Sequence, residues 1–91
     1  MRVKVSGRAT RDLERLRDWL APKSPAAASR AISAISQAIL SLSELPGRGR
    51  LIAPRVRELR VDFGRDGYLL RYRVHDDEVV IARVFHGRER R

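Results

Sequence analysis

The chain has 91 residues, no cysteine and a formal net charge of +9 at pH 7. This length allows one small domain with one hydrophobic core and leaves no room for a second. Without cysteine there is neither a disulfide framework nor a thiolate metal site, and no apolar run has the length of a secretion signal or a membrane span, so a soluble cytoplasmic protein is expected.

The positive charge is carried almost entirely by arginine. Of the 20 basic residues, only Lys4 and Lys23 are lysine. An arginine-rich composition can reflect a GC-rich coding genome. A charge of +9 nevertheless attracts nucleic acid or an acidic protein, so it indicates the kind of partner rather than the fold.

The first third of the chain is predicted to form a short strand and an amphipathic helix. Residues 2–5 alternate apolar and basic side chains, and Ser6 is a suitable helix N-cap. Within residues 8–20 the apolar stripe consists of Ala9, Leu13, Leu16 and Leu20. Trp19 lies beside this stripe, where it is either the edge of the core or an anchor for a partner.

A second helix is predicted from residue 26 to about residue 45. Ser24 and Pro25 are a good N-cap and first helical residue, which makes the two helices a hairpin. Its apolar stripe is Ala28, Ile32, Ile35, Ile39 and Leu42. The opposite face is poor in charge, with Ser29, Ser33, Ser36, Gln37, Ser41 and Ser43. That face is either a weakly polar surface or is covered by another chain.

Three antiparallel strands are predicted in the second half. Residues 46–54 form a loop in which Leu51 and Ile52 are expected to touch the body of the protein. Apolar and polar residues then alternate in residues 58–63 and 68–74. The third strand, residues 79–85, is apolar on both sides except for Arg83 and is expected to be central.

Regular pairing of these strands predicts a cationic face. Placing Val80, Ala82 and Val84 inward leaves Val79, Ile81, Arg83 and Phe85 outward, on the same side as Arg60, Arg71 and Arg73. These arginines are expected to face outward without partners, where they either bind phosphates or carboxylates or form an ordinary solvated face. The whole pattern predicts an α+β fold of two layers, β-α-α-β-β-β, with a helical hairpin on one face of a four-stranded antiparallel sheet.

Several segments, in this order and spacing, resemble toxins of the RelE/ParE superfamily from bacterial type II toxin–antitoxin systems. The matching segments are Ala9-x-x-Asp12-Leu13, Ser24-Pro25 with Ala27, residues 45–48 (LPGR), residues 57–61 (RELRV), residues 68–74 (YLLRYRV) and residues 84–88 (VFHGR). The last segment resembles the ParE-like branch most. The resemblance implies a single toxin domain over residues 1–91, neutralised by a cognate antitoxin in a hetero-oligomer.

The resemblance leaves two activities open: poisoning of DNA gyrase, as in ParE-like toxins, or ribosome-dependent cleavage of mRNA, as in RelE-like toxins. Cleavage would use Arg71 and Arg83 to stabilise the phosphate and His86 to move protons. Because the terminal tyrosine and the Lys or Glu pair of the nuclease branch are missing, gyrase is favoured and the protein is expected not to be an enzyme. His86 is otherwise a hydrogen-bonded surface residue.

Two interaction surfaces are therefore predicted. The expected target-binding residues are Arg60, Arg71, Arg73, Arg83, His86 and Arg88. The expected antitoxin-binding residues are Trp19, Leu20, Ser33, Gln37 and Leu40, along the low-charge face of the helical hairpin.

No cofactor, metal or membrane is expected, because no grouping of His, Asp and Glu has metal-ligand spacing and no glycine-rich phosphate loop follows a strand. A DNA-reading helix is also not indicated, since the second helix carries only Arg30 as a basic residue.

Overall fold

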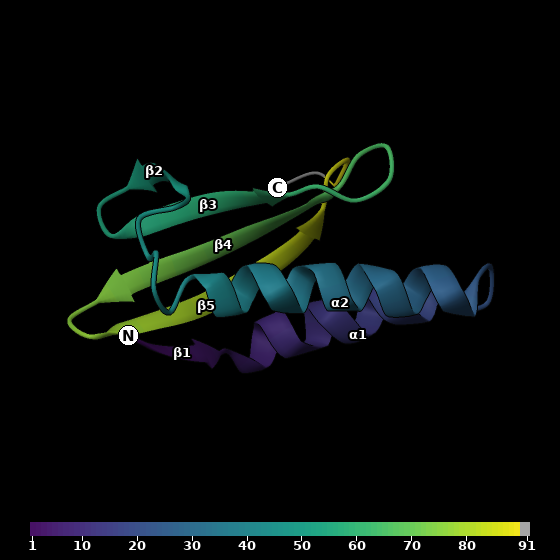
Figure 1. Ribbon diagram of the computed structural model, residues 1–91, viewed down its shortest axis with the longest axis horizontal. Coiled ribbons are helices and arrows are strands. Elements are labelled where there is room, and N and C mark those ends of the chain that lie inside the picture. Colours follow the sequence, from purple (N-terminus) through teal and green to yellow (C-terminus); the bar gives the residue numbers. More distant parts are fainter. Residues whose placement is uncertain (90–91) are drawn as a thin grey trace.

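Two helices pack together on one face of a five-stranded sheet (Figure 1). The computed structural model describes residues 1–89. In chain order the elements are β1 (Arg2–Val5), α1 (Gly7–Leu20), α2 (Pro25–Ser41), β2 (Arg50–Ala53), β3 (Val56–Val61), β4 (Tyr68–His75) and β5 (Glu78–His86). The predicted α+β class and the helical hairpin on one face are confirmed.

Both helices begin at the predicted caps. The Ser6 hydroxyl accepts a hydrogen bond from Ala9 N, and the Ser24 hydroxyl accepts one from Ala27 N, each at 3.1 Å. These bonds satisfy amide groups that have no partner within the first turn of a helix. Pro25 follows Ser24 as the first residue of α2. Local chemistry therefore fixes where each helix starts.

The sheet differs from the prediction in two ways. Its strand order is β1-β5-β4-β3-β2, and β1 runs parallel to β5, so the sheet is mixed rather than wholly antiparallel. The residues predicted as loop include a fifth strand, β2, in which Leu51 and Ile52 are exposed instead of touching the body. A four-residue strand at a sheet edge, flanked by Gly49 and Pro54, has no alternation that a sequence pattern could detect.

A β-bulge in the β4–β5 pairing changes which side chains of β5 face the helices. Arg71 pairs with Arg83 and Tyr72 pairs with Ile81, so Ala82 is the extra residue. Val79 and Ile81 are consequently buried on the helix face, as is Val84 beyond the bulge. The predicted orientation is thus wrong before the bulge and confirmed after it, where Arg83 and Phe85 point to the open face, the side of the sheet away from the helices.

The core lies between the helices and the inward side chains of β3, β4 and β5. The helices extend beyond the end of the sheet at which β4 begins and β5 ends, so the turn between α1 and α2 projects past the strands (Figure 1). None of the helices in residues 1–89 is long and apolar enough to cross a membrane.

The loop before β2 is fastened to the core by Tyr72. This side chain is fully buried, and its hydroxyl donates to Pro46 O and accepts from Gly49 N, both at 2.8 Å. Arg57 donates to Gly49 O at 2.8 Å and holds the same loop from outside. A Cβ at Gly49 would come within 2.7 Å of the Tyr72 hydroxyl, so this close approach requires glycine.

We therefore expect Tyr72→Phe to lower the free energy of unfolding by about 1–3 kcal/mol, because a buried amide and a carbonyl lose their partner. Tyr68→Phe is the matched control, since no hydrogen bond within residues 1–89 involves the Tyr68 hydroxyl, although Tyr68 is also buried. Urea denaturation measures both variants. Equal losses for the two would show that the loop is not held by the hydroxyl.

Candidate functional site

Arg71 and Arg83 are neighbours on the open face of the sheet. They lie directly opposite each other in the β4–β5 pairing. Their guanidinium Cζ atoms lie 5.1 Å and 4.6 Å, respectively, from the centroid of the Phe85 ring. Cations over an aromatic face are attracted by the electron density of the ring. The open face thus holds two guanidinium groups over one aromatic side chain.

Each of these two arginines also has a carboxylate partner. Arg71 donates from Nε and Nη2 to Glu58 Oε2, at 3.0 and 2.8 Å. Arg83 donates from Nε and Nη2 to the two carboxylate oxygens of Asp12, at 2.8 and 3.2 Å. The expectation that Arg71 and Arg83 lack partners is therefore wrong, because α1 and β3 bring carboxylates to them from distant parts of the sequence. The ion pairs hold both side chains in place, and each carboxylate offsets the positive charge of its arginine.

Asp12 is the most enclosed member of this group. Asp12 is 5% exposed. In addition to the hydrogen bonds from Arg83, its Oδ2 atom accepts one from Val84 N at 2.9 Å. Burial by itself would raise the pKa of Asp12, but the hydrogen bonds from Arg83 and Val84 and the charges of Arg83 and Arg15 together lower it below its ordinary value. The same contact with Asp12 raises the pKa of Arg83. Asp12 therefore joins α1 to β5 as a carboxylate.

Sequence reasoning missed the role of Asp12, although the spacing contained a signal. Asp12 follows Ala9 by three residues and precedes Leu16 by four, so all three share one face of α1. A carboxylate on the buried face of a helix requires a partner. In a chain this rich in arginine, that partner could have been expected on the sheet.

Three of the predicted target-binding arginines remain exposed. Arg60 and Arg73 lie on the open face, and Arg88 lies in the turn after β5. Within residues 1–89, the guanidinium groups of Arg60 and Arg73 take part in no ion pair or hydrogen bond. These two cations are therefore available to an anionic partner without breaking a contact inside the fold.

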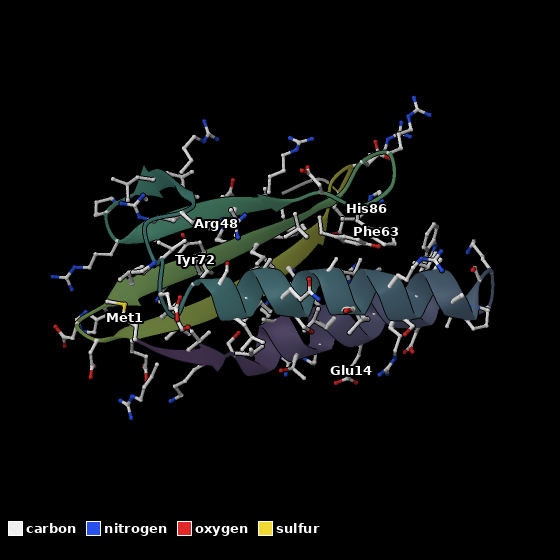
Figure 2. The ribbon with its side chains drawn as sticks, viewed as in Figure 1. Met1, Glu14, Arg48, Phe63, Tyr72 and His86 are labelled. Carbon is white, nitrogen blue, oxygen red and sulfur yellow. The ribbon has the colours of Figure 1, made fainter. Side chains whose placement is uncertain are left out.

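His86 lies on the other face of the sheet. It pairs with the buried Tyr68 at the end of β5, and the two rings meet edge to face with centroids 5.7 Å apart. Figure 2 shows His86 beside Phe63, at the opposite end of the sheet from Tyr72 and Arg48. The structure therefore does not bring His86 together with Arg71 and Arg83, the set that the sequence suggested for RNA cleavage.

His86 instead lines a cleft between α1 and the end of β5, which we call the α1–β5 cleft. Its volume is about 340 Å³. The residues that line it are Arg15, Leu16, Trp19, Tyr68, His86 and Glu89.

The turn that follows β5 is held by contacts with α1 and with the β3–β4 connection. Glu89 accepts from Arg15 Nη1 at 2.6 Å and from His86 N at 2.7 Å. Gly87 N donates to Gly67 O at 2.8 Å, and a Cβ at Gly87 would overlap the carbonyl oxygen of Asp66. The turn after β5 therefore packs against both α1 and the β3–β4 connection.

The residues predicted to bind an antitoxin lie in different places on the helical hairpin. Trp19 is exposed in the α1–β5 cleft, whereas Gln37 lines a separate groove with Arg60 and Asp62. Ser33 and Leu40 are exposed on α2. Leu20 is half-buried and packs against the core, so less of it is accessible to a partner.

No group of three or more His, Cys, Asp or Glu side chains within residues 1–89 is arranged to hold a metal ion. The cations of the open face are arginines, two of which, Arg71 and Arg83, are fixed by carboxylates. Such groups can bind an anion by charge and hydrogen bonds.

Comparison with known proteins identifies the family. Residues 3–91 match the family described as ParE toxin of the type II toxin–antitoxin system parDE. Toxin RelE3 of Caulobacter vibrioides is 47% identical over 89 residues, covering 98% of this chain and 97% of that protein. Toxin RelE1 of the same organism is 43% identical over 89 residues, covering 98% and 96%.

A solved structure from the chromosomal ParDE toxin–antitoxin system of P. aeruginosa has the same fold. It superposes with a TM-score of 0.80 over 94% of this chain and 95% of the other, at 24% sequence identity. The match along almost the whole sequence agrees with the β-α-α-β-β-β-β order and the helical hairpin described above. The chain therefore belongs to the ParE toxin family within the RelE/ParE superfamily of type II toxin–antitoxin systems.

Proposed function

We propose that this type II toxin arrests bacterial growth by poisoning DNA gyrase and that a small acidic antitoxin neutralises it. Membership of the toxin family, over residues 3–91, supports the growth arrest and the antitoxin partner. Its net charge of +9 favours an acidic antitoxin. Because gyrase acts on the bacterial chromosome, the proposal places the toxin in the cytoplasm.

The choice of gyrase over mRNA is carried by one observation, the separation of His86 from the arginine pair. Metal-free cleavage of RNA requires groups that accept and donate protons beside the cation that stabilises the phosphate. Arg71 and Arg83 lie on the open face, whereas His86 packs against Tyr68 on the helix face. This separation supports the poisoning of gyrase over the cleavage of RNA.

A ribosome-dependent nuclease is the second candidate. Two close relatives are named RelE toxins, and the fixed pair of Arg71 and Arg83 has the geometry to bind a phosphate. Glu58 Oε2 already accepts both hydrogen bonds from Arg71. Binding of a phosphate without cleavage is compatible with a toxin that acts on a DNA-bound enzyme.

The target surface that we propose is the open face together with the turn after β5. Arg60, Arg73 and Arg88 supply exposed positive charge, and Arg71 and Arg83 supply a rigid centre. Arg71 and Arg83 each donate two hydrogen bonds to a carboxylate, and a guanidinium group has five N–H donors. Each arginine therefore keeps donors for an anion of the target. We leave His86 out of this target surface, because it packs against Tyr68 on the helix face of the sheet.

The antitoxin surface that we propose runs over the helical hairpin, from Trp19 on α1 to Ser33, Gln37 and Leu40 on α2. Exposed apolar side chains separated by weakly polar ones suit a partner helix that lies in a groove. Leu20 adds packing beneath this surface rather than a direct anchor.

Purified toxin tests the choice between the two targets. We expect it to inhibit supercoiling by gyrase or to trap cleaved DNA, and we expect ribosome toeprinting to show no cuts linked to codons. His86→Ala should leave the effect on gyrase largely intact, since His86 lies off the open face. Codon-linked cuts that disappear on changing His86 or Arg71 would reverse the assignment and make the protein an endoribonuclease.

A further inference from the structure

The α1–β5 cleft has a preformed apolar interior. Leu16 and the rings of Tyr68 and His86 line it together with Trp19, which is 61% exposed. Lys23 places its Nζ atom 3.9 Å from the centroid of the Trp19 ring and donates to Trp19 O at 3.1 Å. These contacts with Lys23 favour one position of the indole beside the cleft. Because Trp19 remains exposed, its apolar surface is open to a ligand.

Two of the residues that line the cleft, Tyr68 and His86, also carry polar groups. No hydrogen bond within residues 1–89 involves the Tyr68 hydroxyl, although the residue is only 6% exposed. His86 Nδ1 accepts from Arg88 N at 3.2 Å, which leaves the proton of the neutral ring on Nε2. The cleft therefore offers a hydroxyl and an imidazole N–H beside an aromatic wall.

The size of the cleft limits what it can hold. About 340 Å³ is near the lower end of the range of roughly 300–1,000 Å³ for ligand pockets. Such a space is large enough to admit one bulky apolar side chain, and a buried side chain of that kind is the usual anchor of a protein interface. The Arg15–Glu89 ion pair, at 2.6 Å, holds α1 and the turn after β5 at a fixed separation, so the site is preorganised.

The charge of the chain selects among protein partners. A second copy would bring two molecules of charge +9 together, which electrostatic repulsion opposes. An acidic partner is attracted by the same charge, and the Lys23 ammonium group lies over Trp19 beside the cleft.

We propose that the α1–β5 cleft receives a single bulky apolar side chain from an acidic segment of the antitoxin. This inference rests on the proposed function only in naming the antitoxin as the partner. Occupation of the cleft would cover Trp19 and give the Tyr68 hydroxyl and His86 Nε2 a polar neighbour on the bound segment. Trp19, Tyr68 and His86 are then specificity-determining residues for the antitoxin.

Two synthetic peptides provide the first test. Each is an acidic, helix-forming 15-residue peptide without tryptophan, one with phenylalanine and the other with alanine at the central position. Because Trp19 is the only tryptophan of the toxin, its emission reports occupation of the cleft. We expect the phenylalanine peptide to shift this emission and to bind about tenfold or more tightly than the alanine peptide, a difference of about 1.4 kcal/mol.

Variants and the antitoxin itself complete the test. Measured by the anisotropy of a fluorescein-labelled phenylalanine peptide, Trp19→Ala should weaken binding about tenfold, whereas Leu45→Ala should not, although Leu45 is 59% exposed. The protein that relieves growth arrest on co-expression should displace the peptide. Equal binding of the two peptides, a peptide that remains bound beside the antitoxin, or a change in Trp19 emission on raising the concentration of the toxin alone would each overturn the proposal.

These outcomes are independent of the gyrase assay. A toxin that poisons gyrase but binds both peptides equally contradicts only the inference about the cleft. A toxin that selects the phenylalanine peptide, releases it to the antitoxin and leaves gyrase unaffected contradicts only the proposed target.

Discussion

Replacement of Asp12 by alanine is expected to destabilise the folded protein by about 2–4 kcal/mol, because a part-buried ion pair and the buried hydrogen bond to Val84 N are lost together. Asp12 is 5% exposed and satisfies the Arg83 guanidinium and the amide of Val84. Alanine would leave both donors without this acceptor where α1 packs against β5. Thermal and urea denaturation measure the loss.

Asp18→Ala is the matched control for Asp12→Ala. Asp18 lies on the same helix, and its Oδ1 atom is 3.6 Å from Arg17 Nε, but its side chain is 73% exposed. An exposed pair of this kind contributes about 0–1 kcal/mol. Similar losses for the two variants would contradict the structural role given to Asp12.

The pH dependence of stability gives a second readout of the same residue. Because the folded protein lowers the pKa of Asp12, the unfolded chain binds the proton more readily. The contribution of Asp12 is therefore fully present above the unfolded-state pKa of about 3.9 and is lost as the pH falls through the lower folded-state pKa. Asp12→Asn should remove this part of the acid destabilisation.

The ion pair with Asp12 also changes what is expected of Arg83. An unpaired surface arginine could be replaced with little effect on stability. Arg83 instead donates two hydrogen bonds to a buried carboxylate, so Arg83→Ala would leave Asp12 with only Val84 N and the more distant Arg15. A loss of toxicity in that variant would therefore not separate target binding from folding.

The elements that sequence reasoning located correctly are those set by nearby residues. Ser6 and Ser24 act as caps within their own helices, and Tyr72 alternates with charged neighbours and is buried with its hydroxyl at the loop. Periodicity and capping depend on residues three or four positions apart, or on alternation along one strand. Such signals can be followed along the chain without knowing the tertiary structure.

The features that were missed depend on contacts between distant residues. The parallel pairing of β1 with β5 joins Val3 to Val79, and the Asp12–Arg83 bond spans 71 positions. The bulge at Ala82 is defined only by the pairing with β4, yet it determines which side chains of β5 face the helices. For that reason the sequence placed the arginines correctly on the open face but could not show which of them have carboxylate partners.

Charge reversal at the two unpaired arginines of the open face is expected to abolish growth arrest while leaving the fold intact. In Arg60→Glu combined with Arg73→Glu, two exposed cations without partners in residues 1–89 become anions. Electrostatic attraction can raise association rates by about 10- to 1,000-fold, so reversal should weaken target binding by about tenfold or more. Induced expression followed by colony counts measures the effect, with protein levels checked by immunoblot.

The appropriate control carries the same change in net charge on the helices. Arg8→Glu combined with Arg30→Glu also reverses two exposed arginines, on α1 and α2 and away from the open face. If the total charge attracts the target, both double variants should lose toxicity equally, whereas a site on the open face predicts loss only in the first. Full toxicity of the Arg60 and Arg73 double variant at equal expression and melting temperature would move the target surface to the loop that carries Arg48 and Arg50, because that loop presents the next exposed arginines beside the sheet.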